Sequence, residues 1–132
     1  MVVVAYLCIA LLGLLLTLGG FYVSLIRGKT NVVGGVPKPL DDKLHKAIRA
    51  HGNACEYNVF IALTFYILSQ HQPPTWLLIC MIWLTIARYA HFFGLLFCET
   101  MAKPNLLRFF GAGSTFVAGS LMCISLAMVI LG

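Results

Sequence analysis

Four long apolar stretches, separated by short polar segments, set the pattern of the chain. They cover about residues 2–26, 43–69, 75–98 and 105–131. At 1.5 Å of rise per residue, a helix of about 20 residues crosses the hydrocarbon core of a bilayer. The pattern therefore predicts an all-α membrane protein, a four-transmembrane-helix bundle that forms one domain over residues 1–132.

The segments between these stretches carry residues that begin and end helices. Residues 27–42 contain glycines, prolines and charges and form the one substantial loop. Asp41 or Asp42 can cap the following helix, because a carboxylate accepts the free N–H groups of a first turn. Asn105 can cap the fourth helix in the same way. Residues 70–74 contain two prolines and predict a short turn.

Composition and charge support this membrane assignment and set its orientation. Hydrophobic residues make up 61% of the chain and charged residues only 10%, which is outside the usual range of soluble domains. The net charge is +5, but the basic residues follow the first and third stretches, which is typical of topology signals and not of nucleic-acid binding. These residues are Arg27, Lys29, Lys38, Lys43 and Lys46, then Lys103 and Arg108. We therefore expect loop 27–42 on the cytoplasmic side and both termini on the other side.

Two rows of small residues predict close helix packing. The first stretch carries Gly13, Thr17, Gly20 and Ser24 at spacings of four, three and four, and the fourth carries a row at every fourth residue, namely Gly111, Thr115, Gly119, Cys123 and Ala127. Small side chains let helix backbones approach one another in lipid. Either row can pack within a subunit or between subunits.

Cysteine usage gives no sign of a metal site. The five cysteines are scattered without a C-x-x-C pair. His51 and Cys55 lie one helical turn apart, but two ligands without a third are weak evidence for a metal. We expect no metal.

A polar stripe interrupts the second stretch. In the segment R-A-H-G-N-A-C-E, the side chains of Arg49, Asn53 and Glu56 lie within roughly 40° of one another on a helix. Polar and charged side chains are costly in a membrane unless they have partners or a ligand. Arg88 and His91 lie one turn apart in the third stretch, and with Arg27 and Arg108 they are expected at the same cytoplasmic end. This convergence predicts a site.

Structural roles are open for the same residues. Glu56 and an arginine could form a buried ion pair that fixes helix packing, and Arg88 with His91 could serve the same end. His51 lies about 200° around the helix from Arg49. We expect it to make a structural hydrogen bond across helices, near Asn58.

The segment R-A-H-G-N-A-C-E, a preceding A-I and the later A-R-Y-A-H-F-F-G, together with the hydropathy, resemble the MAPEG superfamily. Its members are membrane-associated proteins in eicosanoid and glutathione metabolism. The I-R-x-H-G-N form is most similar to the bacterial inner-membrane branch. The resemblance implies a homotrimer in that membrane, with glutathione as co-substrate held between subunits near the cytoplasmic face.

The resemblance also implies roles for individual residues. Arg49, Asn53 and Glu56 match second-helix residues that contact glutathione, and His51 matches the histidine of the motif. The remaining matches are Arg88 and His91, a third-helix pair, and Arg27 and Arg108, basic positions that hold carboxylates or face the sulfur. We hypothesise that Arg108, or failing that Arg27, stabilises the thiolate.

Three departures from the family pattern argue against the eicosanoid activities. Gly52 stands in place of a second arginine, Leu95 in place of a tyrosine near the thiol, and Phe109 in place of a serine. The resemblance therefore implies a glutathione-dependent transferase or peroxidase that acts on apolar electrophiles or lipid hydroperoxides. The alternative is a non-enzymatic lipid-binding or scaffold protein. A transporter is less well supported, because no helix shows a mid-membrane break.

Overall fold

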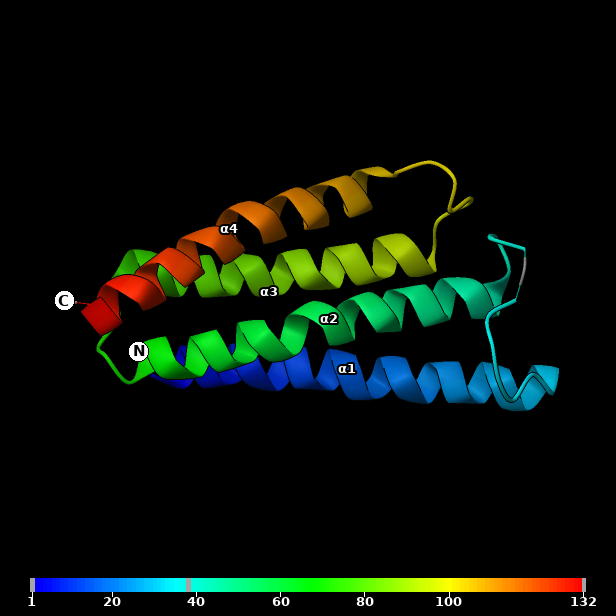
Figure 1. Cartoon of the computed structure of the whole chain (residues 1–132), viewed down its shortest axis with the longest axis horizontal. Coiled ribbons are helices and arrows are strands. Elements are labelled where there is room, and N and C mark those ends of the chain that lie inside the picture. The colour runs from blue at the N-terminus through cyan, green and yellow to red at the C-terminus, as the bar shows by residue number, and fades with distance from the viewer. Residues whose placement is uncertain (1, 38, 132) are drawn as a thin grey trace.

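In a computed structural model, which describes residues 2–37 and 39–131, the chain folds into four α-helices. They are α1 (Val2–Thr30), α2 (Lys43–Ser69), α3 (Thr75–Leu96) and α4 (Leu106–Leu131). Successive helices run in opposite directions, so that loops 31–42 and 97–105 lie at one end of the bundle and both termini at the other (Figure 1). The predicted all-α, four-helix fold is confirmed. Lys38, one of the predicted topology signals, lies outside the described residues.

Hydrogen bonds explain where the helices begin. The Asp42 side chain caps α2 by accepting from the amides of Leu44 and His45, at 2.7 and 3.3 Å. Asn105 Oδ1 accepts from the amide of Arg108 at 2.8 Å. Both capping residues are therefore among those that the sequence proposed.

Helix ends differ from the predicted bounds where a charged side chain holds nearby carbonyl groups. Helix α1 continues past residue 26 to Thr30, and the guanidinium of Arg27 donates to the carbonyl groups of Val32 and Gly35 just beyond it. Helix α3 ends at Leu96 instead of 98, and the Lys46 ammonium donates to the carbonyl groups of residues 98 and 99 just beyond it.

Three helices are long and apolar enough to cross a membrane, namely α1, α3 and α4 over Leu106–Val129. Helix α2 has 27 residues but carries the polar stripe, and it was not found among these apolar spans. Since α1 and α3 run in the same direction (Figure 1), the chain between them has to return through the same layer. The protein is therefore an integral membrane protein.

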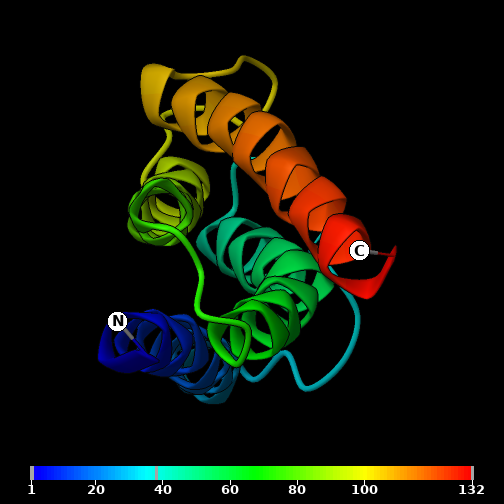
Figure 2. The same cartoon turned by 90° about the vertical axis from the view of Figure 1, so that its left-hand side faces the viewer.

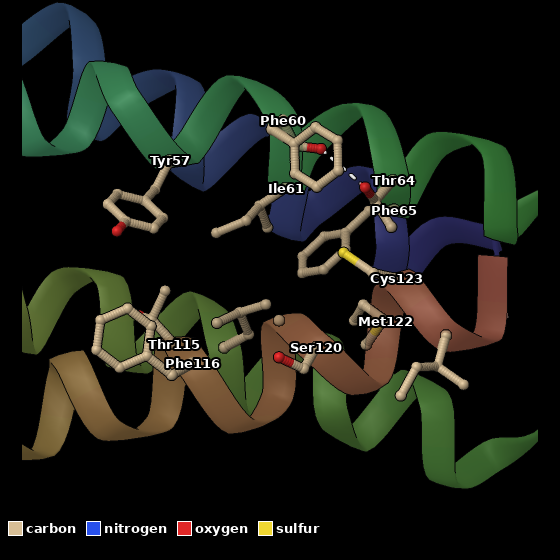
Figure 3. A pocket seen from close by; sticks show the side chains of 13 residues that line it. Tyr57, Phe60, Ile61, Thr64, Phe65, Thr115, Phe116, Ser120, Met122 and Cys123 are labelled. Carbon is tan, nitrogen blue, oxygen red and sulfur yellow. Dashed lines mark hydrogen bonds between the residues drawn. The ribbon is translucent and has the colours of Figure 1, made fainter. Parts of the chain in front are cut away.

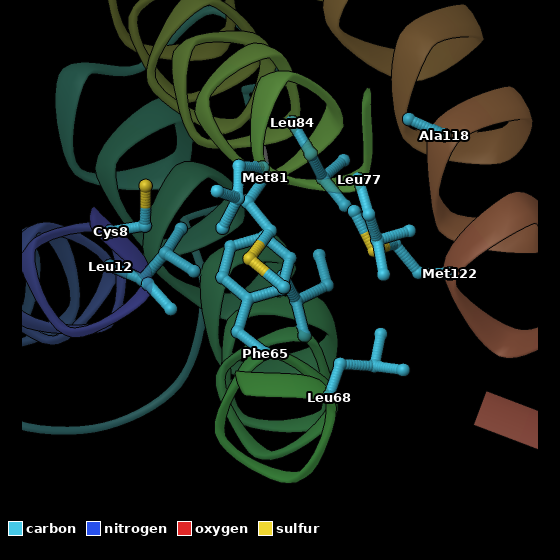
Figure 4. Close-up of a cluster of buried hydrophobic side chains, with 12 residues drawn as sticks. Cys8, Leu12, Phe65, Leu68, Leu77, Met81, Leu84, Ala118 and Met122 are labelled. Carbon is cyan, nitrogen blue, oxygen red and sulfur yellow. The ribbon is translucent and has the colours of Figure 1, made fainter. Parts of the chain in front are cut away.

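The largest core cluster joins all four helices in the half of the bundle nearest the termini. Phe65 of α2 and Met81 of α3 lie at its centre with no exposed surface. Cys8 and Leu12 reach them from α1, and Met122 reaches them from α4 (Figure 4). The apolar positions of each helix therefore meet between the helices, as expected for a bundle.

The row of small residues on α4 makes tight contact only in its first half. A methyl group on Gly111 would lie 2.5 Å from His91 Cβ, so α3 and α4 touch backbone to backbone there. Thr115 is also buried, whereas Cys123 and Ala127 are exposed. Figure 2 shows the reason, since α4 slants across the bundle from α3 toward α2.

The row on α1 behaves differently. Gly13, Thr17 and Ser24 lie on the exposed surface, and the two hydroxyl groups bond to carbonyl groups of their own helix. Only Gly20 comes close to a neighbouring helix, at the ring of His51. Within the subunit, this row therefore provides one close contact and not a continuous seam.

Candidate functional site

Arg88 is the centre of a buried polar network between α2, α3 and α4. Its side chain is 2% exposed. Nε donates to Asn58 Oδ1 at 3.0 Å, Nη2 donates to Asn53 Oδ1 at 2.6 Å and to the Asn53 carbonyl at 3.1 Å, and Nη1 donates to Thr115 Oγ1 at 3.4 Å. Each of these acceptors is neutral. The buried charge is thus held by amide, hydroxyl and carbonyl oxygens and not by Glu56.

Aromatic and amide groups complete this network. The guanidinium carbon of Arg88 lies 4.9 Å from the centre of the Tyr57 ring, within range of a cation–π interaction. Asn58 is fully buried and its Nδ2 donates to the Leu12 carbonyl at 3.4 Å, which ties α1 to the same network. Sequence reasoning did not assign Asn58 to this network. The available signal was a second amide within the apolar part of α2, five residues beyond Asn53.

The polar stripe of α2 lies on the outer face of the bundle. Arg49 and Glu56 are exposed, and Asn53 is half-buried between this face and Arg88. Because Arg88 occupies the carbonyl oxygen of the Asn53 side chain, the Nδ2 group of that amide remains as its donor. Arg88 therefore orients one member of the stripe from behind.

His91 and Arg108 meet where α3 and α4 pack together. His91 Nδ1 lies 3.2 Å from the Arg108 carbonyl. The Arg108 guanidinium points into loop 97–105, where Nη1 donates to the carbonyl groups of Met101 and Lys103 at 3.3 and 2.9 Å. Arg108 is half-buried at this end of the bundle.

Arg27 and His51 complete the set of predicted residues. The structure places Arg27 at the same end of the bundle, where it holds the loop carbonyl groups described above. His51 turns toward α1, where its ring packs against Gly19 and Gly20. Its ring nitrogens lie 3.5 and 3.9 Å from Cys55 Sγ on the same helix, whereas Asn58 bonds to Arg88 and Leu12.

The two loops at this end are joined to each other. Asp41 Oδ1 accepts from the Met101 amide at 2.7 Å, and Lys46 Nζ donates to the carbonyl groups of Cys98 and Glu99 at 2.8 and 3.0 Å. The hydrogen bond from Met101 lowers the pKa of the Asp41 carboxyl group below its ordinary value of 3.8. Lys46, which the sequence analysis counts among the topology signals, is therefore also part of the structure that holds the site end together.

An apolar cavity of about 450 Å³ lies between α2, α3 and α4. Figure 3 shows its walls, with Tyr57 and Phe60 on α2 facing Phe116 on α4. At one end it reaches Tyr57 and Thr115, both of which contact Arg88. Its size falls within the usual range for small-molecule sites. The cavity lies beyond the tight contact at Gly111, where α4 leaves α3 and crosses toward α2.

The fold and this arrangement define a class of protein, the polytopic helical membrane proteins with basic residues gathered at one end. Within the described residues, no three His, Cys, Asp or Glu side chains gather closely enough to hold a metal ion. The chain matches the model of the MAPEG family over residues 4–128, and it belongs to that family. No curated protein and no solved structure matches it.

Proposed function

We propose that this MAPEG-family protein is a glutathione-dependent membrane transferase or peroxidase. Glutathione is its co-substrate, and apolar electrophiles or lipid hydroperoxides are its second substrates. Family membership supports glutathione-related chemistry. One structural observation carries the proposal furthest. Within residues 53–57 of α2, Asn53 and Glu56 belong to the polar stripe and Tyr57 lines the apolar cavity, and Arg88 contacts both Asn53 and Tyr57.

The polar stripe suits the charges of glutathione. Glutathione carries two carboxylates and one amine, which call for cations and a carboxylate respectively. Arg49 and Arg27 supply guanidinium groups, which can grip a carboxylate with two hydrogen bonds, and Glu56 supplies the carboxylate. Arg88 and His91 position these groups from inside the bundle in this proposal.

The exposed location of the stripe supports an intersubunit site. Arg49 and Glu56 both project from the outer face of α2. A charged side chain facing lipid is costly, so a neighbouring copy of the chain is the natural cover. We therefore place glutathione between subunits of a homotrimer.

Thiolate formation requires a nearby cation. A free thiol with a pKa near 8.5 is mostly protonated at neutral pH, and each tenfold gain in the thiolate fraction requires about 1.4 kcal/mol. In our proposal the guanidinium of Arg108 provides this stabilisation, because it lies at the same end as the stripe and is partly exposed. Arg27 is the second choice.

The cavity provides access for the oily substrate. Its lining is mostly aromatic and aliphatic, and it lies within the apolar part of the bundle. An apolar electrophile can dissolve in the bilayer and enter there, while glutathione arrives from water. In our proposal loop 31–42 faces the cytoplasm of a bacterium, both termini face away from it, and the protein belongs to the inner-membrane branch of the family.

A turnover assay tests the proposal. The purified protein in detergent is supplied with glutathione and either an activated aryl halide or a lipid hydroperoxide. We expect conjugation or peroxide reduction above the uncatalysed rate, and a large loss in Glu56→Gln. The matched control is Glu99→Gln, which changes an exposed glutamate in loop 97–105. Equal rates with and without protein for both substrates would reject the enzymatic proposal.

A non-enzymatic lipid-binding protein is the second candidate. The cavity supports it, as does Leu95, which is a buried leucine where the resemblance places a tyrosine near the thiol. In that case a fluorescent fatty-acid analogue binds to the protein, and no turnover accompanies the binding.

A further inference from the structure

An apolar groove of about 350 Å³ runs between α1 and α3, separate from the cavity between α2, α3 and α4. Each of its two walls is a row of side chains spaced four residues apart. The rows are Leu14, Leu18 and Tyr22 on α1, and Tyr89, Phe93 and Phe97 on α3 and at its end. Since residues four apart lie on one face of a helix, each row follows its helix for about 12 Å. The groove is therefore about two helical turns long.

A tight contact between the two helices forms the floor of the groove. A methyl group on Gly19 would lie 3.0 Å from Phe92 Cε2, so the glycine lets the Phe92 ring lie against α1. Tyr89 joins the helices at the end of the groove farther from the loops, where its hydroxyl donates to an α1 carbonyl group at 2.8 Å. The α1 wall remains open to the outside, because Leu18 is 56% exposed. An elongated apolar group can therefore lie along the groove.

The other end of the groove carries a positive charge. Tyr22 lies at this end, toward loop 31–42, and the Lys43 ammonium lies 6.0 Å from the centre of its ring, within range of a cation–π interaction. Lys43 is exposed at the first residue of α2. The carboxylate of the adjacent Asp42 is engaged in the helix cap, where it accepts from two backbone amides. The groove thus runs from the apolar part of the bundle to a cation at the loop end.

We propose that this groove is a binding site for an anionic phospholipid, with one acyl chain between the two rows and the headgroup phosphate at Lys43. A phospholipid presents these groups in the same order, because its phosphate lies at the membrane surface and its chains extend toward the middle of the bilayer. Tyrosine is typical of the headgroup level, which matches the place of Tyr22 near the loops. The site does not involve glutathione, so it can fail or succeed separately from the proposed function.

Native mass spectrometry tests this proposal. The intact protein in neutral detergent is mixed with phosphatidylglycerol or with phosphatidylcholine of the same acyl chains, and the lipid retained per subunit is measured over a concentration series. We expect phosphatidylglycerol to bind about fivefold more tightly, because one lysine near an anionic headgroup contributes an attraction of this order. Equal affinity for the two lipids would overturn the proposal. Retention of neither lipid would also overturn it, and is the result expected if a second copy of the chain covers the groove.

Two variants with matched controls assign the lipid to the groove. Lys43→Gln should remove the preference for phosphatidylglycerol, whereas Lys29→Gln, which changes an exposed lysine at the end of α1, should keep it. Leu18→Trp fills the groove and should cause the loss of both bound lipids. Leu7→Trp changes a similarly exposed leucine of α1 outside the groove and should bind lipid as the parent does. If Lys43→Gln keeps the full preference, or Leu18→Trp binds lipid like the parent, the lipid does not occupy this groove.

Discussion

Replacing Arg88 with leucine should destabilise the bundle strongly. The substitution removes all four hydrogen bonds of the Arg88 side chain, of which the three shortest, to Asn58 Oδ1, Asn53 Oδ1 and the Asn53 carbonyl, measure 3.0, 2.6 and 3.1 Å. Interhelical hydrogen bonds in membrane proteins contribute about 0.6 kcal/mol on average and up to about 1.7 kcal/mol. Three such bonds therefore correspond to about 2 to 5 kcal/mol of unfolding free energy.

Unfolding by SDS in mixed micelles measures this effect. Trp83 of α3 packs edge-on against Phe110 of α4 at 5.2 Å, so tryptophan fluorescence reports the separation of these helices. Arg49→Leu is the matched control, because Arg49 is an exposed arginine. Its substitution should change the free energy by no more than about 0.5 kcal/mol, as is usual for surface positions.

A double-mutant cycle with Asn58→Leu tests the physical reason. If the Arg88–Asn58 hydrogen bond is a main contributor, the double variant loses less stability than the two single variants together, by about 0.5 to 3 kcal/mol. An Arg88→Leu protein that unfolds at the parent's SDS fraction would refute the assignment. Strict additivity in the cycle would also refute it.

Three further predictions follow from the close contacts and charges at the site end. Gly111→Ala places a methyl group 2.5 Å from His91 Cβ and should cost about 1 to 3 kcal/mol of stability in the SDS unfolding assay. Gly113→Ala, with open space at that position, should be neutral or stabilising in the same assay. The pKa of the Asp41 carboxyl group lies below 3.8 because of its hydrogen bond from Met101, so its contribution to stability is present above the unfolded pKa and is lost as pH falls through the folded value. Asp41→Asn should therefore flatten the acid-induced loss of thermal stability below about pH 4, and an unchanged pH profile would count against the contact. Arg108→Ala should lower kcat for glutathione conjugation about tenfold or more, Arg108→Lys should retain part of it, and parent-like turnover in Arg108→Ala would exclude that residue as the thiolate partner.

Hydrophobic pattern and local chemistry were enough to predict the helices. The apolar runs give the four elements, and the preference of carboxylate and amide groups for first-turn N–H groups gives the caps at Asp42 and Asn105. The helix ends near Thr30 and Leu96 were not predictable in this way. Side chains bond to carbonyl groups just beyond both ends, and near Leu96 that side chain is Lys46, about fifty residues away in the sequence.

The sequence predicts where along each helix the basic residues lie, but not all of them reach one end. Arg27 lies near the end of α1 and Arg108 in the first turn of α4, so both lie at the end of the bundle that carries loops 31–42 and 97–105, whereas Arg88 bonds to Asn58 in the middle of α2. Spacing along α2 also predicts that Arg49 and Glu56 share a face. It cannot predict that Arg88 turns inward to Asn58, because this contact depends on how α3 rotates against α2. The cavity likewise depends on the slant of α4.

Calorimetric titration of glutathione tests the central claim most directly. The parent protein and the control Lys29→Gln, which changes an exposed lysine at the end of α1, should bind glutathione with the same affinity. Arg49→Gln and Glu56→Gln should each weaken binding about tenfold or more, since hydrogen bonds to charged groups contribute about 1.5 to 3 kcal/mol. The absence of binding at millimolar glutathione, or equal affinity in all four proteins, would contradict the account.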